Sequence, residues 1–139
     1  MTAEEIKKRL QEHMAIQHSC EVMREHIQSK CDEIERLKAT IRYAKGDRKT
    51  LSNIDLAAAQ INRSIARYSK QIMQREESEQ EILQMLERVE KADARSVIIL
   101  RFIDGVRFED IPDQLHISAR TVWYRYKEAV NQMADYSDL

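Results

Sequence analysis

The most informative part of the chain is residues 96–133, which read SVIILRFIDGVRFEDIPDQLHISARTVWYRYKEAVNQM. Apolar residues at helical spacing fill the first positions, and Asp104-Gly105 interrupts them. A short helix then fits residues 108–115, a tight turn fits 116–118, and a longer helix follows. Ser118 is the expected N-cap of that helix, because its hydroxyl can accept a hydrogen bond from one of the first backbone N–H groups. The pattern predicts a helix-turn-helix.

The second helix of this motif has an apolar face and a polar face. The residues expected to face inward recur at spacings of four and three: Val122, Tyr126, and Ala129 or Val130. The polar face suits a duplex, because an Arg near a helix start can reach guanine, hydroxyls serve base edges or phosphates, and cations neutralise phosphates. The predicted DNA-binding residues are Ser118, Arg120, Thr121, Tyr124, Arg125 and Lys127. Trp123 is expected either to pack on a neighbouring helix or to contact a DNA sugar or a thymine methyl group.

The same region resembles region 4 of sigma-70-type factors. The matching residues are Leu100-Arg101-Phe102, Asp104-Gly105, Phe108-Glu109-Asp110-Ile111, Ile117-Ser118, Thr121-Val122 and Ala129-Val130. With its long helical N-terminal half, the whole chain is similar to short phage and prophage regulators of late transcription (ArpU/RinA-like). This resemblance implies promoter-DNA binding by the second helix, and it makes RNA polymerase a candidate partner.

Three residues depart from the region-4 pattern. Pro112 stands where Ala is usual, Arg107 replaces the usual Ser or Thr cap, and His116 occupies a turn position usually held by Gly. A proline inside a helix removes a hydrogen bond and clashes with the preceding turn, but it is tolerated in the first turn. We therefore expect the first helix of the motif either to start late, with Asp110 as its cap, or to be kinked at Pro112.

The composition favours an all-α protein. The 139 residues include only two Gly and one Pro, too few for a fold of many short strands, and helix-forming residues dominate. The longest apolar run, residues 97–100, is far too short to cross a membrane, and the acidic N-terminus does not resemble a signal peptide. We therefore expect a protein of the reducing cytoplasm.

The charge balance limits how the chain could bind nucleic acid. Its formal net charge is −1, and residues 92–139 carry six Lys or Arg against eight Asp or Glu. Any DNA affinity of this segment alone is expected to be weak and sensitive to salt. This favours binding as a dimer or alongside a larger assembly.

Residues 1–91 predict a long antiparallel helical hairpin, which would serve dimerisation or partner binding, ahead of a DNA-binding domain at 92–139. The first helix is expected over residues 3–45, with Gly46-Asp47 at its end. A seven-residue apolar repeat is typical of a coiled-coil seam. Such a repeat is present here, although His13 and Cys20 weaken it: Ile6, His13, Cys20, Ile27, Ile34 and Ile41, widened by Leu10, Ile16, Met23 and Leu37.

The second long helix is expected to be capped by Thr50 or Ser52 and to run unbroken to about residue 91. Its predicted seam alternates spacings of four and three: Ile54, Ala58, Ile61, Ile65, Tyr68 and Ile72. The basic face around Arg63, Arg67 and Lys70 is expected to be simply solvated.

Neither catalysis nor a cofactor is indicated by the sequence. Cys20 and Cys31 would lie three helical turns apart, too far for a disulfide, and the four His residues show no ligand spacing with a Cys. There is no Gly-rich phosphate loop and no recognisable nucleophile–base arrangement. We expect a protein that is not an enzyme and that carries neither metal nor cofactor.

The leading hypothesis is a sequence-specific DNA-binding transcription regulator, and the resemblance implies one of phage or prophage type. Two alternatives remain open. A small-terminase-like DNA-packaging adaptor also combines a helix-turn-helix with a helical hairpin, by analogy of architecture. A helical interaction scaffold would retain the fold without binding DNA. The oligomeric state separates the first two, since a packaging adaptor would form a ring of many subunits.

Overall fold

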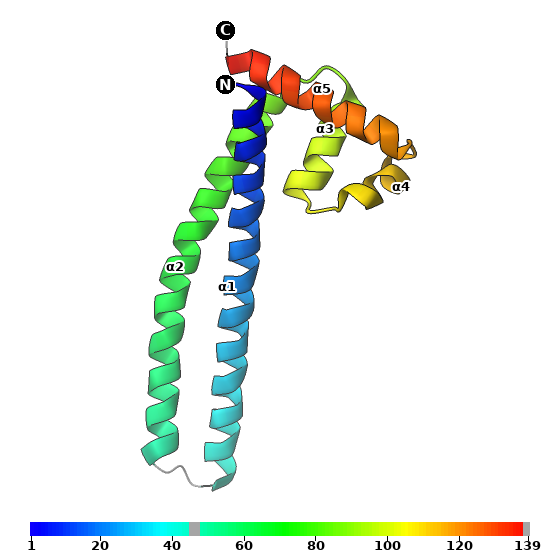
Figure 1. Cartoon of the computed structure of the whole chain (residues 1–139). Coiled ribbons are helices and arrows are strands. Elements are labelled where there is room, and N and C mark those ends of the chain that lie inside the picture. Colours follow the sequence, from blue (N-terminus) through cyan, green and yellow to red (C-terminus); the bar gives the residue numbers. More distant parts are fainter. Residues whose placement is uncertain (45–47, 138–139) are drawn as a thin grey trace. The chain divides into compact units, whose positions relative to one another are not determined.

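The computed structural model describes residues 1–44 and 48–137, with side chains described at positions 1–39, 48–49 and 51–134. The elements, drawn in Figure 1, are α1 (Ala3–Ala44), α2 (Arg48–Leu86), α3 (Ala92–Ile98), a π-helical turn η1 (Ile99–Ile103), a 3-10 turn η2 (Phe108–Asp110), α4 (Ile111–Leu115) and α5 (Ala119–Ser137). No strand is present in these residues. The all-α fold, with a long helical hairpin followed by shorter helices, is confirmed.

The bounds of the two long helices differ in part from those expected. The first helix begins as predicted, and its predicted end at Gly46-Asp47 lies outside the described residues. The expected caps at Thr50 and Ser52 are wrong, because α2 already begins at Arg48. Arg and Lys are good helix formers, so the helix extends over positions 48 and 49.

The second long helix ends at Leu86 rather than near residue 91. The residues that follow are held by tertiary contacts that replace helical ones. Val89 is buried, and Arg95 donates hydrogen bonds to the carbonyls of Val89 and Glu90 at 2.6 and 3.1 Å. The backbone N–H of Glu90 donates to Gln132 Oε1 at 3.1 Å. These contacts offset the helical hydrogen bonds lost when α2 stops.

Residue contacts divide the chain into two units. The helix-turn-helix unit comprises residues 1–16 and 75–139, and the hairpin unit comprises residues 17–74. The sequence-based division instead assigned residues 1–91 to the hairpin and residues 92–139 to the DNA-binding domain, with one boundary along the chain. The difference arises because the start of α1 and the end of α2 contribute to the same core as α3 and α5.

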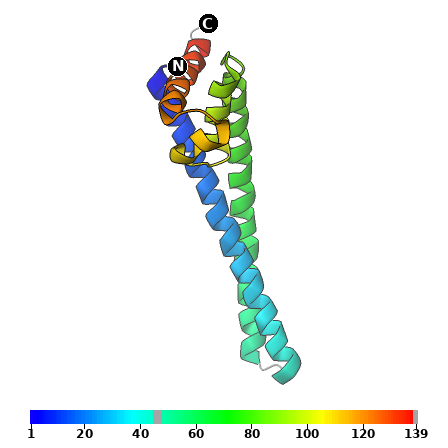
Figure 2. The ribbon, with the colours of Figure 1, turned by 90° about the vertical axis from the view of Figure 1, so that its right-hand side faces the viewer.

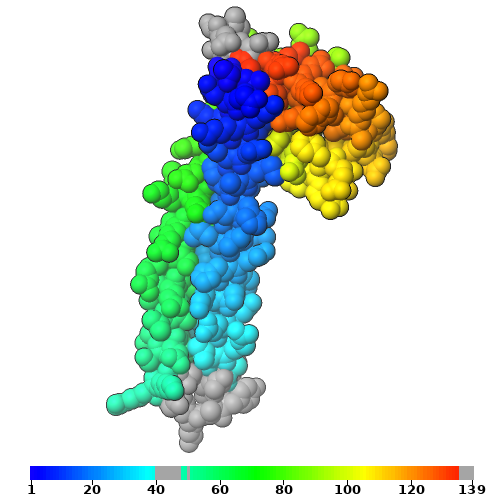
Figure 3. All heavy atoms as spheres, in the orientation of Figure 1, coloured from blue at the N-terminus to red at the C-terminus, as the bar shows by residue number. Residues whose placement is uncertain are grey.

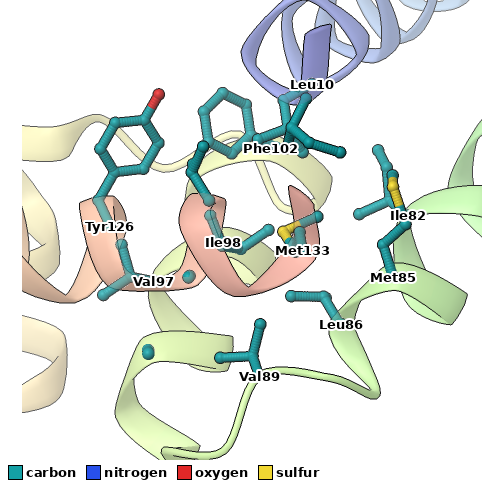
Figure 4. Packing of buried hydrophobic residues seen from close by; sticks show 14 of the residues in the cluster. Leu10, Ile82, Met85, Leu86, Val89, Val97, Ile98, Phe102, Tyr126 and Met133 are labelled. Atoms are coloured by element: carbon teal, nitrogen blue, oxygen red, sulfur yellow. The ribbon is translucent and has the colours of Figure 1, made fainter. Parts of the chain in front are cut away.

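The core of the helix-turn-helix unit draws on all parts of that unit (Figure 4). Ile6 and Leu10 of α1 are fully buried, and Ile82, Met85 and Leu86 come from α2. The space-filling view shows the first residues of the chain against the last turns of α5 (Figure 3). The remaining core residues are Val89, Ala94, Val97, Ile98, Phe102, Ile111, Val122, Tyr126, Ala129, Val130, Met133 and Ala134.

An aromatic cluster fixes the helices of the motif to one another. The ring centroids of Phe102, Phe108 and Tyr126 lie 5.3 to 6.2 Å apart, with edge-to-face or tilted geometry. The guanidinium of Arg101 lies 5.0 Å from the Phe108 ring centroid and donates to the carbonyl of Val106. Such aromatic pairs stabilise by about 1 kcal/mol each beyond their buried area.

The proline of the motif lies where a helix tolerates it. Asp110 occupies the N-cap position of α4, and Pro112 lies in the first turn, as one of the two expected solutions required. The Asp110 carboxylate makes no cap hydrogen bond; it accepts one from Arg107 Nε at 3.0 Å. Asp110 therefore occupies the predicted N-cap position, but its carboxylate accepts a hydrogen bond from the Arg107 side chain and not from a backbone N–H of α4.

The turn residue His116 has a left-handed backbone, with φ 55° and ψ 42°. This conformation costs a residue with a Cβ roughly 1 kcal/mol, which a glycine avoids. We predict that His116→Gly raises the free energy of unfolding by about 0.5–1 kcal/mol, measured by urea denaturation.

The matched opposite change is Gly105→Ala, at φ +75° with no atom within 4 Å of an added Cβ. Because an added Cβ meets no atom there, this variant has only the cost of a left-handed backbone at a residue with a Cβ. It is expected to lower the free energy of unfolding by about 1 kcal/mol. Destabilisation by His116→Gly would show that the imidazole, rather than the backbone, governs this position.

The two long helices run antiparallel and side by side through the hairpin unit (Figures 1 and 2). Ser19 Oγ donates to Gln71 Oε1 at 2.9 Å and so fixes their register. On α1, Cys20 is buried, and Met23, Ile27, Ile34 and Leu37 are half-buried. Cys20 and the exposed Cys31 are both free thiols.

The predicted seam of α2 is confirmed except at one position. Ile61 is buried, and Ile54, Ala58, Tyr68 and Ile72 are half-buried, as expected. Ile65 is 45% exposed, so its place in the seam is wrong. The adjacent row also contributes buried or half-buried side chains, at Ala57, Ser64 and Gln71. The buried face is therefore broader than the repeat, and the periodicity alone could not single out Ile65 as exposed.

His13 is a buried polar residue of the helix-turn-helix unit. Its Nδ1 lies 2.9 Å from Ser78 Oγ of α2, and its Nε2 is buried without a hydrogen-bond partner among the described residues. Burial lowers the pKa of His13 below its ordinary value of 6.5; nearby Arg75 lowers it further, and Glu79 opposes the shift. The imidazole is therefore neutral at pH 7.

We predict that stability falls as the pH is lowered from 7 to about 5, because the unfolded chain binds the His13 proton more readily than the folded one. The stability that depends on a neutral His13 is fully present above the pKa of His13 in the unfolded chain. It is lost as the pH falls through the pKa of His13 in the folded protein. Urea denaturation at both pH values should show that the free energy of unfolding falls less between pH 7 and 5 for His13→Leu than for wild type. His18→Leu, at an exposed position, serves as the control, and its free energy of unfolding should change between the two pH values as much as that of wild type. The same change in the free energy of unfolding between the two pH values in all three proteins would contradict the prediction.

Candidate nucleic-acid interface

The α5 helix starts at a capped turn. The backbone N–H of Thr121 donates to Ser118 Oγ at 3.1 Å, so the predicted N-cap is confirmed. The hydroxyls of Ser118 and Thr121 also lie 2.8 Å apart. Ser118 is exposed and Thr121 half-buried, so both hydroxyls lie at the rim of the helix start.

The outward row of α5 consists of Arg120, Tyr124 and Lys127, which recur at spacings of four and three and are all exposed. Asn131 is also exposed and extends the row by one further turn. The opposite face carries the predicted inner residues Val122, Tyr126, Ala129 and Val130, all buried. This division places the row at the surface and its helix firmly on the core.

Two cations of the row lie on aromatic rings. The Arg120 guanidinium is 5.5 Å from the Tyr124 ring centroid, and its Nη2 donates to the Tyr124 hydroxyl at 3.2 Å. Lys127 Nζ lies 5.1 Å from the Trp123 ring centroid. Cation–π contacts at exposed sites are worth about 0.5–1 kcal/mol, enough to bias side-chain direction while leaving the charges accessible.

Trp123, for which the sequence left open packing on a neighbouring helix or a contact with DNA, is 50% exposed beside the row. Its ring contacts Tyr126 of the same helix, at 5.5 Å between centroids. It lies four residues before Lys127, a spacing that brings two side chains together on a helix. The sequence analysis missed Asn131, although its four-residue spacing from Lys127 could have placed it in the row.

Arg125 is half-buried and lies off the row of Arg120, Tyr124 and Lys127. Its Nε donates to Asp93 Oδ2 at 2.7 Å, and its Nη1 donates to Glu128 Oε2 at 3.3 Å. The hydrogen bond from Arg125 lowers the pKa of Asp93 below its ordinary value. Arg125 therefore ties α5 to α3, and the structure does not bring it together with Arg120 and Lys127.

Asp93 itself lies inside the first turn of α3, whose N-cap position is Lys91. Its carboxylate pairs with the Arg125 guanidinium.

The charge partners of the other cations set the row apart. Arg95 and Arg101 donate to backbone carbonyls, and Arg107 pairs with Glu109 and Asp110. Arg101 also lies over an aromatic ring, but it is half-buried and donates to a backbone carbonyl. Within the described part of residues 92–139, Arg120 and Lys127 are exposed cations on aromatic rings with neither a carboxylate nor a carbonyl partner. Their charges are the ones free to neutralise a phosphate.

No helix in the described ranges is both long enough and apolar enough to span a membrane. In those same ranges, no cluster of three His, Cys, Asp or Glu side chains has an arrangement that could hold a metal ion.

Comparison with known proteins gives one family. A family model described as "Protein of unknown function (DUF1492)" matches residues 40–134, a range that includes α2, α3, α4 and all but the last three residues of α5. No curated protein and no solved structure matches the chain. Since the family model covers more than half of the sequence, the chain belongs to the DUF1492 family.

Proposed function

We propose that the protein is a sequence-specific DNA-binding transcription regulator in which α5 enters the major groove. The observation that carries the proposal is the exposed row of Arg120, Tyr124 and Lys127, whose charges have no carboxylate partner. The row projects from the second helix of a helix-turn-helix, the element that such motifs present to DNA.

Each residue of the row has a chemical role in this proposal. Arg120, in the first turn of α5, would donate two hydrogen bonds to guanine O6 and N7. Lys127 and the Ser118 hydroxyl would contact phosphates, which position the helix without reading sequence. Thr121 and the exposed rings of Tyr124 and Trp123 would contact base edges, thymine methyl groups or sugars. Arg125 keeps α5 on α3 and would act through that contact.

The kind of regulator follows from the resemblance to sigma-70 region 4. The order of α3, η1, α4 and α5 is consistent with that resemblance, and the Gly105 turn and the Ser118 cap lie at its matching residues. We therefore propose a regulator of phage or prophage type, with RNA polymerase as a candidate partner and the cytoplasm as its location.

A homodimer through the long helices would compensate for the weak affinity of one unit. Large apolar side chains of α2 in the hairpin unit remain exposed: Leu51, Leu56, Ile65 and Met73. We predict that wild type sediments as a dimer and that Ile65→Lys weakens the dimer at least about tenfold. Val22→Lys, also an exposed apolar residue but on α1, is the matched control.

Sedimentation equilibrium measures both variants, and a monomeric wild type would contradict the dimer. A ring of eight or more subunits would instead favour the packaging adaptor.

The function itself is tested by selecting duplexes from a random pool with the full chain, at about 50 mM salt where phosphate contacts are strongest. The expected result is enrichment of one short sequence that outcompetes an unrelated duplex of equal length. A pool that binds without enrichment would contradict sequence-specific recognition, and a pool that does not bind would contradict DNA binding altogether.

A further inference from the structure

A second basic feature lies in the hairpin unit and shares no residue with the row assigned above. A pocket of about 350 Å³ lies between α1 and α2, in the part of the hairpin where Figures 1 and 2 show the helices side by side. Its lining residues are His26 and Lys30 from α1, and Gln60, Arg63, Ser64 and Arg67 from α2. The volume lies in the range of small-molecule sites, which begins at about 300 Å³.

The lining holds no carboxylate. Two arginines, one lysine and one histidine are among the lining residues, and of these His26, Arg63 and Arg67 are exposed to solvent. Lys30 has a carboxylate neighbour on its own helix, Glu33, at 3.3 Å. Among the described residues, no hydrogen bond or ion pair connects Arg63 or Arg67 to an acidic side chain. The sequence-based expectation of a merely solvated face did not include the residues that α1 adds.

Such an arrangement is unfavourable without an anion. Like charges four residues apart on a helix, such as Arg63 and Arg67, repel each other, and Lys30 from the facing helix adds to this repulsion. A bound anion converts the repulsion into attraction. Guanidinium groups bind phosphate oxygens through paired hydrogen bonds, and lysine supplies a point charge. The hydroxyl of Ser64 and the amide of Gln60 add neutral donors at the same cavity.

We propose that this pocket, defined by His26, Lys30, Gln60, Arg63, Ser64 and Arg67, binds a phosphate group. The group could come from a small phosphorylated molecule or from a nucleic-acid backbone, because the same donors recognise both. The site is independent of the row on α5.

The test is calorimetric titration of the full chain with pyrophosphate, at about 50 mM salt. Saturable binding to wild type is expected, and Arg63→Gln with Arg67→Gln should weaken it at least about tenfold. The control is Lys49→Gln with Lys70→Gln, which removes equal charge from exposed positions of α2 outside the pocket and should change affinity by less than about twofold. Thermal unfolding without pyrophosphate verifies that all variants fold.

Two results would overturn the proposal: no saturable binding to wild type, or equal losses in the pocket and control variants. A duplex titration of the same proteins identifies the source of the phosphate. Weaker duplex binding and a smaller salt dependence in the pocket variant would indicate a nucleic-acid backbone; unchanged duplex binding would indicate a small molecule. Pyrophosphate binding should persist in Arg120→Ala with Lys127→Ala, so failure at α5 and failure at the pocket are distinguishable.

Discussion

A fragment of residues 92–139 will not fold when it is separated from the rest of the chain. Its helices contribute one side of a core whose other side comes from Ile6, Leu10 and residues 82–89. Without those residues, the apolar faces of α3 and α5 would be exposed to water, at about 25 cal/mol for each Å² left uncovered. The fragment is expected to show little helical circular dichroism and poorly dispersed amide resonances.

The same reasoning applies to a single side chain in the full-length protein. Leu10 is fully buried although it lies more than 80 residues before the helix-turn-helix in sequence. Leu10→Ala is expected to lower the free energy of unfolding by about 2–5 kcal/mol, a large part of the stability of a small protein. Val22→Ala, at a 51% exposed position of the same helix, is expected to cost less than about 0.5 kcal/mol.

Urea denaturation compares the two variants directly. Similar stabilities for Leu10→Ala and Val22→Ala, or a well-folded 92–139 fragment, would show that the helix-turn-helix is an autonomous domain. Residues 92–139 would then fold without residues 1–91, as a domain boundary at 91/92 requires.

Replacing Arg120 and Lys127 together by Ala is expected to lower duplex affinity by about two orders of magnitude or more. A bidentate arginine–guanine contact is worth about 1–3 kcal/mol, and each lost phosphate contact removes further electrostatic attraction. The plot of log affinity against log salt should become less steep by about one unit for the phosphate contact of Lys127.

The control for this experiment is Lys8→Ala with Lys49→Ala, which removes the same net charge from exposed positions on α1 and α2. Its affinity should stay within about threefold of wild type, because neither lysine belongs to the row on α5 and exposed charges that make no contact are screened by salt. Equal losses in both double variants would mean that only overall charge attracts the duplex, and that α5 does not read it.

Local features of the helix-turn-helix were predictable because short-range chemistry determines them. Ser118 caps α5 through a hydrogen bond to the N–H three residues later, and Pro112 can occupy only the first turn of α4. His116 stands at a C-cap position that requires a left-handed backbone, and the region-4 pattern had already marked that position. The inner face of α5 followed from the spacing of its apolar residues.

Features that depend on distant residues were not predictable in the same way. The end of α2 at Leu86 depends on Arg95 and Gln132, which come later in the chain. The exposure of Ile65 depends on which row of α2 faces α1. Arg125 reads as a phosphate contact in sequence, but its neighbour in space is Asp93, 32 residues earlier. The basic pocket likewise requires α1 and α2 to be paired before His26 and Lys30 can join Arg63 and Arg67.

The most direct test of DNA recognition by α5 uses the single tryptophan of the chain, Trp123, which lies against Lys127. The full chain is titrated with the enriched duplex at about 50 mM salt, and tryptophan emission and duplex anisotropy are recorded on the same samples. If α5 contacts the duplex, both signals change with the same midpoint. Saturating duplex binding with unchanged Trp123 emission would place the DNA elsewhere on the protein and would contradict the assignment.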